Sequence, residues 1–292
     1  MNSDLVQIYL DAVGRWVHFL AEIMWGGTAY LDAVARWVHV FAGIMWVGTT
    51  YFFTWLDGRF TELEEKANGA PAEPVWMVHS GGFYRVEKQK APQLMPKTLH
   101  WFRWEAALTW LSGMFLFVVV YYMGGLLISA EDSPLSNGAA IGLSLGLLAA
   151  GWVAYDLLWR KIATNETAGL IGSFMLVGAV AWLTTRYLTG RAAYLQLGAM
   201  FGTIMVSNVW MRILPAQRRM VAALKEGRVP DALEAKRAKA ASKHNTFMAV
   251  PVVFIMISNH FPMTYGNAKF NWIILTALVA VGWVAAKLIR RA

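Results

Sequence analysis

The strongest constraint on this chain is a series of apolar runs, each close to the length that crosses a lipid bilayer. A helix of about 20 apolar residues spans a hydrocarbon core of about 30 Å. The runs are continuous rather than alternating, which excludes a membrane β-barrel, and only helices and closed barrels satisfy their backbone groups in lipid. We therefore predict an all-α, polytopic transmembrane bundle of about seven to eight helices. The predicted spans are Leu31–Trp55, Trp104–Leu127, Ile141–Leu158, Ala168–Thr185, Ala193–Ile213, Thr246–Phe261 and Trp272–Leu288.

Composition and charge agree with a membrane protein. The chain is 57% hydrophobic and 15% charged, whereas soluble domains carry about 25% charged residues. We attribute the net charge of +8 to cytoplasmic Lys/Arg loops and not to nucleic-acid binding. The basic loops at 56–103 and 214–243 are therefore placed inside, with the C-terminus, in a bacterial-type inner (cytoplasmic) membrane. The break at 229–231 predicts two short helices on the anionic inner leaflet.

The N-terminal region contains a direct repeat. Tyr9–Ala29 matches Tyr30–Thr50 at an offset of 21 residues, with six differences and no turn signal beyond Gly26-Gly27. We divide the chain into a duplicated segment of uncertain role, 1–29, and a transmembrane domain, 30–292. The first copy could be an extra span, a surface helix or a tandem duplication without a role.

Polar residues stand at both ends of the apolar segment Ser242–Pro262. His244 and Asn245 lie at one end, and Asn259 and His260 lie at the other. Polar groups at membrane depth are costly and usually face a bundle interior where they have a function. This segment is therefore a candidate for part of the functional site.

Four histidines near the two membrane boundaries are suited to b-type haem. His39 and His260 are expected near the outer boundary, and His100 and His244 near the inner one. The 16 residues between His244 and His260 make about 24 Å of helix, so one site cannot contain both. Neutral imidazole is a good axial ligand for haem iron, which makes His39 and His260 the candidate ligands. The alternative is that His39 only hydrogen-bonds a neighbouring helix.

Cysteine and aromatic content narrow the chemistry further. The chain has no cysteine, which excludes a covalent c-type haem on this chain, as well as disulfides and iron–sulfur clusters. Aromatic and basic residues alternate around Trp101 and Arg103. Stacking and charged donors of this kind would hold a planar heterocyclic anion. An interfacial aromatic belt with basic anchors is the alternative.

Three long runs resemble a known family. Arg36–Asp57, Gly81–Gly113 and Lys243–Pro262 look like the membrane domain of the membrane-bound, cytochrome-c-linked urate oxidases, and the resemblance extends from about residue 30 to the C-terminus. It implies oxidation of urate to 5-hydroxyisourate without hydrogen peroxide. Familiar members carry a cytochrome c domain with a Cys-x-x-Cys-His motif. This sequence has none, so we expect a separate cytochrome c as the electron acceptor.

The resemblance and the polar residues together give a set of expected roles. The catalytic candidates are His100, Glu105, His244 and Asn245; the cofactor candidates are His39, His260 and Trp46; the substrate-binding candidates are Trp101, Arg103 and Asn259. The expected partners are urate, cytochrome c and the lipid bilayer, and a homo-oligomer is left open. One alternative is a haem-binding membrane electron-transfer protein without urate activity. A transporter is another, and Asn208 within a span gives it mild support.

Overall fold

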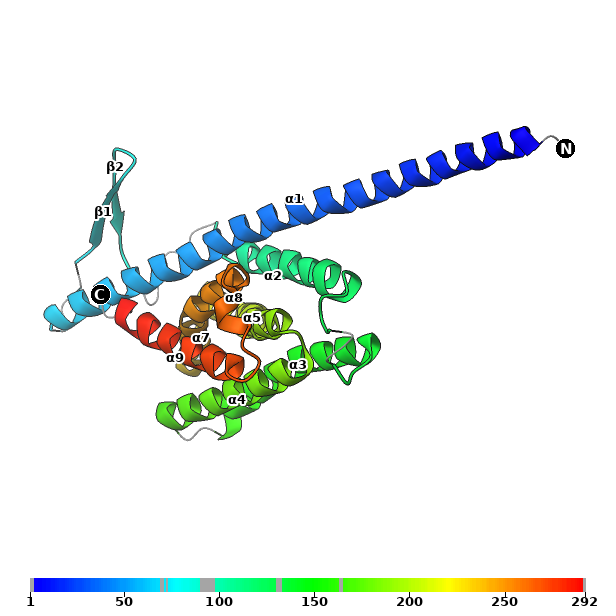
Figure 1. Ribbon diagram of the computed structural model, residues 1–292. Helices are drawn as coiled ribbons and strands as arrows, with labels where there is room; N and C mark the ends of the chain where they lie inside the picture. Colours follow the sequence, from blue (N-terminus) through cyan, green and yellow to red (C-terminus); the bar gives the residue numbers. More distant parts are fainter. Residues whose placement is uncertain are drawn as a thin grey trace.

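The computed structural model describes residues 3–68, 71, 73–89, 98–129, 133–162 and 165–290, with the backbone alone for 3–13 and 17–28. Helices are packed side by side in a bundle, and a single long helix, α1, runs along one side of it (Figure 1). The elements are α1 Ser3–Lys66, β1 Val75–His79, β2 Gly82–Val86, α2 Trp104–Phe117, η1 Val118–Met123, α3 Asn137–Leu157, η2 Leu158–Ile162, α4 Glu166–Tyr187, α5 Gly190–Ser207, η3 Asn208–Ile213, α6 Leu214–Lys225, α7 Ala232–Ile257, η4 Ser258–His260, α8 Pro262–Tyr265 and α9 Asn271–Ile289.

The predicted all-α transmembrane bundle is confirmed. Among the described residues, six helical stretches are long and apolar enough to cross a membrane, and each contains most or all of one predicted span. They are Trp104–Met123, Asn137–Ile162, Glu166–Tyr187, Gly190–Lys225, Ala232–His260 and Asn271–Ile289. The seventh predicted span, Leu31–Trp55, lies within α1. Its His, Trp, Gly and Thr residues dilute its hydropathy, and α1 is not one of the six.

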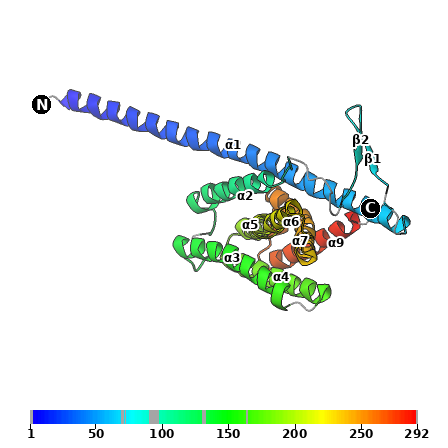
Figure 2. The ribbon, with the colours of Figure 1, turned by 180° about the vertical axis from the view of Figure 1, so that it is seen from behind.

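Helix α1 contains both copies of the repeat without a break. Its 64 residues correspond to about 96 Å at 1.5 Å per residue. The part that contains the second copy packs along α2, whereas the N-terminal part extends beyond the bundle (Figures 1 and 2). The first copy is therefore a continuation of the second-copy helix and not a separate helix behind a turn.

The basic connection at 214–243 differs from the prediction in one respect. Two helices do flank the break near 229–231, and Asp231 caps the second by accepting a hydrogen bond from Leu233 N at 2.8 Å. However, α6 follows η3 directly, and α7 continues to Ile257. These helices are thus extensions of the spans and not separate surface helices.

A β-hairpin within residues 56–103 was not predicted. Val75–His79 and Gly82–Val86 pair in antiparallel register, and Ser80 and Gly81 have φ of 50° and 76°. Positive φ at both central residues is typical of the tight turn that matches strand twist. The sequence signal is the set of β-branched and aromatic residues on either side of Ser80-Gly81.

The core of the bundle forms where α5, α7 and α9 approach closely. Tyr194 and Leu197 of α5 are fully buried. A Cβ on Gly198 would lie 2.7 Å from Ile255 Cγ2, and one on Gly282 would lie 2.9 Å from Pro251 Cδ. Small residues at such crossings let membrane helices pack tightly. The packing fixes the position of α7, which carries His244.

Candidate active site

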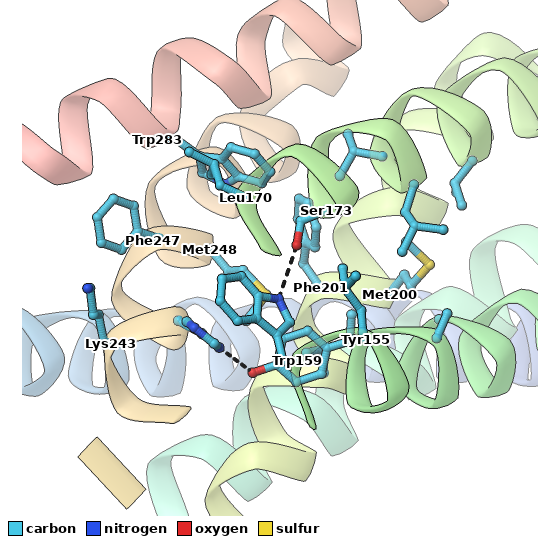
Figure 3. A pocket seen from close by; sticks show the side chains of 18 of the residues that line it. Tyr155, Trp159, Leu170, Ser173, Met200, Phe201, Lys243, Phe247, Met248 and Trp283 are labelled. Carbon is cyan, nitrogen blue, oxygen red and sulfur yellow. Dashed lines mark hydrogen bonds between the residues drawn. The ribbon is translucent and has the colours of Figure 1, made fainter. Parts of the chain in front are cut away.

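A cavity of about 740 Å³ lies between α3, α4, α5, α7 and α9. Most of its wall is apolar, and Leu170, Met200, Phe201, Met248 and Trp283 line it (Figure 3). One end is polar and basic. That end is lined by Tyr155, Trp159, Glu166, Lys243, His244, Lys287 and Arg290.

A chain of hydrogen bonds leads from this end of the cavity into the bundle. Tyr155 Oη lies 2.7 Å from His244 Nδ1, an interaction drawn in Figure 3. Asn208 Nδ2 donates to Tyr155 Oη at 3.0 Å and to Asn245 Oδ1 at 2.9 Å. Asn245 Nδ2 in turn donates to the Met205 carbonyl at 3.0 Å. Tyr155 Oη accepts the hydrogen bond from Asn208, and a hydroxyl oxygen can accept a second one. Donation from His244 Nδ1 to the same oxygen leaves Nε2 of His244 unprotonated.

The backbone near these residues departs from regular α-helix. Tyr155 lies three residues before the π-helical turn η2, and Asn208 begins the π-helical turn η3. Such turns are rare and often occur at functional sites, because they redirect side chains within a helix. Asn208 is fully buried, and its Oδ1 has no hydrogen-bond partner in the described part of the chain. A buried acceptor without a partner costs about 1–3 kcal/mol, which favours a functional role for this residue.

Trp159 forms an aromatic wall beside His244. The two ring centroids are 4.1 Å apart, and Trp159 Nε1 donates to Ser173 Oγ at 3.1 Å. Gly169 makes room for the indole, because a Cβ there would lie 2.6 Å from the ring. The hydrogen bond and the missing Cβ together hold the ring in one orientation.

The charges at the basic end are partly paired. Lys243 Nζ contacts both carboxylate oxygens of Glu166 at 2.9 Å. Arg290 lies over the Phe247 ring at 5.9 Å, and Lys287 is exposed on the cavity wall. With three cations and one carboxylate, this end of the cavity carries a net positive charge.

The predicted residues do not all lie together. His244 and Asn245 join the network described above, whereas the candidates near the start of α2 form a different group. His100 packs edge-on against Phe102 at 4.5 Å, and Arg103 lies over Trp104 at 5.3 Å. Trp46 and Trp101 pack against the cluster of Ala106, Val209 and Leu214. Glu105 lies in the first turn of α2 and is half-buried. The catalytic roles of His100 and Glu105 stay predictions.

His39 makes the hydrogen bond to a neighbouring helix that was the alternative to haem ligation. Its Nδ1 lies 2.9 Å from the Thr109 carbonyl and 3.2 Å from Ser112 Oγ, and its ring fills the space left by the absent Cβ of Gly113. Donation from Nδ1 to a carbonyl is also how ligating histidines are oriented, and it leaves Nε2 for a metal. Both interpretations remain compatible with this contact.

The second haem candidate is placed differently. His260 ends η4 with an exposed side chain, and the neighbouring Asn259 accepts a hydrogen bond from Arg191 Nε at 3.1 Å. Within the described ranges, no group of three His, Asp or Glu side chains could hold a metal ion, and no contact joins His260 to His39. His39 is therefore suited to be one axial ligand of a haem iron, whereas His260 is not placed as the second ligand.

Sequence reasoning missed several residues of the cavity, and they share a signal. Tyr155 and Trp159 are amphipathic residues near the end of a span, and Lys287 and Arg290 end the last span. Asn208, which the sequence offers as support for a transporter, joins the hydrogen-bond network without lining the cavity. Intramembrane polar residues are functional candidates by default. However, the sequence cannot show which of them face one another.

Comparison with known proteins supplies the family. The family described as "Urate oxidase N-terminal" matches residues 28–291. The chain belongs to the urate oxidase N-terminal family. No curated protein and no solved structure gives a match. The family match includes the second copy of the repeat, the six membrane-spanning helices and every residue of the cavity network, so this chain is a membrane protein related to urate oxidases.

Proposed function

We propose that this protein oxidises urate to 5-hydroxyisourate and that the basic end of the cavity holds the substrate. The observation that carries the proposal is the His244–Tyr155 pair on the wall of a cavity bordered by cations and by Trp159, in a chain of the urate oxidase N-terminal family. Urate is a planar monoanion at neutral pH. Its ring would stack on the indole, and the cations would attract its charge.

The reaction needs a proton acceptor and an electron acceptor. Urate monoanion and water give 5-hydroxyisourate, one proton and two electrons. We assign the proton to Nε2 of His244, because the imidazole lines the cavity and Tyr155 orients it through Nδ1. General acid–base groups act within hydrogen-bond reach of the reacting atom. Tyr155, Asn208 and Asn245 act as positioning residues.

The electrons leave the chain in this proposal. Two molecules of a separate cytochrome c each accept one electron, as the family resemblance implies. We also retain the proposal of b-type haem with His39 as one axial ligand, although no step of the mechanism is derived through it. His39→Ala should remove a b-type absorption spectrum from the purified protein, and an unchanged spectrum would reject this ligand.

The orientation in the membrane is also a proposal. The basic end of the cavity and the C-terminus would face the cytoplasm by the bias of Lys and Arg. Urate from the cytoplasm would then enter at this end.

The test uses membranes that contain the whole chain, with urate and oxidised cytochrome c. We expect two cytochromes to be reduced for each urate lost, with no peroxide. His244→Gln should lower the rate at least about 100-fold. His79→Gln is the matched control, because His79 is exposed on the hairpin and its Nδ1 lies 2.9 Å from Ser80 Oγ, away from the cavity lining. Urate loss that is equal in both variants would contradict the assignment, and no urate loss with any acceptor would reject the function.

A further inference from the structure

The β1–β2 hairpin has an apolar face that the rest of the described chain leaves uncovered. In the register of the two strands, Trp76 lies opposite Arg85, and Val78 lies opposite Phe83. Because side chains alternate along a strand, these four lie on one face. Trp76, Val78 and Phe83 are 63%, 69% and 81% exposed.

The opposite face of the hairpin is attached to α1. Val75, Met77 and Val86 pack with Leu56, Phe60 and Leu63 of α1. Lys88, just after β2, pairs with Asp57 of α1, and Asp57 also lies 3.4 Å from Lys239 of α7. An isolated two-stranded hairpin is marginal in water. Packing against α1 therefore buries only one of the two apolar faces of the hairpin.

The position of the hairpin indicates what covers the other face. In both ribbon views it projects sideways from α1, away from the bundle, near the end of the bundle where the C-terminus lies (Figures 1 and 2). That end is charged, since it carries Lys287 and Arg290 of α9 and the turn at residues 62–66 of α1. The hairpin therefore extends from a membrane-spanning bundle toward the zone where hydrocarbon meets headgroups.

The composition of the free face matches that zone. Trp and other aromatic rings concentrate at the membrane–water boundary, and Arg and Lys there approach anionic headgroups. Arg85 on this face is 56% exposed and is paired with Glu87, while Lys88 lies at the base of the hairpin. A water-facing hairpin would expose a contiguous patch of Trp, Val and Phe at an energetic cost.

From these observations we propose that the hairpin lies in the headgroup layer of the bilayer, with Trp76, Val78 and Phe83 inserted among the lipids. The hairpin then braces the connection between α1 and α2 against the membrane surface. This role is independent of urate oxidation.

The absence of cysteine makes the test direct. Single cysteines replace Val78 or Phe83, and a nitroxide label is attached to the protein in vesicles that contain anionic phospholipid. Val229→Cys is the matched control, because Val229 is 91% exposed in the loop between α6 and α7. The collision rates with oxygen, which partitions into lipid, and with a water-soluble nickel chelate are then compared.

Labels at 78 and 83 should collide several-fold more with oxygen than with nickel, and the label at 229 should show the reverse. Equal nickel accessibility at all three positions would overturn the proposal. Spin–spin broadening at 78 and 83, absent when labelled protein is diluted with unlabelled protein, would overturn it in favour of a second copy covering the face. Both cysteines replace exposed residues, so the fold should be retained. Thermal unfolding of each variant, compared with the unsubstituted protein, checks this.

Discussion

Tyr155→Phe removes a single oxygen atom at the centre of the candidate site. The hydroxyl lies between His244 Nδ1 and Asn208 Nδ2, so two hydrogen bonds, of 2.7 Å and 3.0 Å, are lost while the ring remains. Polar contacts between membrane helices are worth about 0.6–2 kcal/mol each. We therefore expect the variant to lose about 1–3 kcal/mol of unfolding free energy.

The effect on catalysis should exceed the effect on stability. Without the hydroxyl, His244 loses the group that orients its ring, and misplacement of a catalytic group by about 1 Å can cost about 100-fold in rate. We expect kcat to fall about 10- to 100-fold, with a smaller change in KM, because the cations that attract urate are untouched. The assay is urate loss at saturating cytochrome c.

Tyr122→Phe separates the two effects. Tyr122 Oη lies 2.7 Å from Ser144 Oγ, which donates to Gln196 at 2.5 Å, and none of these three lines the cavity. This control should show a comparable loss of melting temperature with unchanged kcat. If Tyr155→Phe and Tyr122→Phe lower kcat equally, the assignment of Tyr155 as a positioning residue is wrong.

Three further predictions test other parts of the account. Gly113→Ala should lower the free energy of unfolding by about 1–3 kcal/mol, because the new Cβ would lie 2.7 Å from His39 Cε1. Gly142→Ala is the control and should be neutral or stabilising, because a Cβ there would have no atom within 4 Å. Thermal unfolding of the two variants measures the difference. Burial raises the pKa of Asp57, but the hydrogen bonds and charges of two lysines lower it more, so its pKa lies below 3.8 in the folded protein. Its stabilising contribution is then present above about pH 4 and is lost as the pH falls through the folded pKa. Asp57→Asn should therefore lower the free energy of unfolding at pH 7 by at most about 1 kcal/mol for this partly exposed pair, and a difference that does not shrink as the pH falls below about 4 would contradict this. Lys287→Gln should raise KM for urate severalfold at low salt and less at high salt, and a salt-independent KM would count against binding at this end.

The sequence predicted the spans well because the bilayer imposes a length and an apolar composition on each one. It could not predict that α1 is continuous, since a repeat without a turn signal is equally compatible with two helices. The hairpin was missed because its two short strands are apolar on both faces, and the alternation of apolar and polar residues that marks a strand is therefore weak. Asp57 shows the same limit, because its partners Lys88 and Lys239 lie 31 and 182 positions away.

The candidate site was predicted only in part, for a related reason. His244 and Asn245 could be recognised because polar residues at the end of an apolar run stand out. Their partners Tyr155 and Asn208 come from two other helices, and the π-helical turns near them decide which way they face. The rotation of one helix relative to its neighbour decides which side chains meet. It depends on packing between helices, such as the close contact at Gly198, and the periodicity of a single helix does not determine it.

The most direct test of the central claim is whether urate occupies the cavity. Thr167 lines it and is exposed, whereas Lys161 is exposed nearby and does not line it. In this cysteine-free chain, Thr167→Cys and Lys161→Cys can each be modified with a small thiol-specific reagent, with and without urate. The account predicts that urate slows modification at position 167 and not at 161, and that modification at 167 abolishes urate oxidation. Modification at 167 at the same rate with and without saturating urate, in a protein that still oxidises urate, would place the substrate elsewhere and contradict the account.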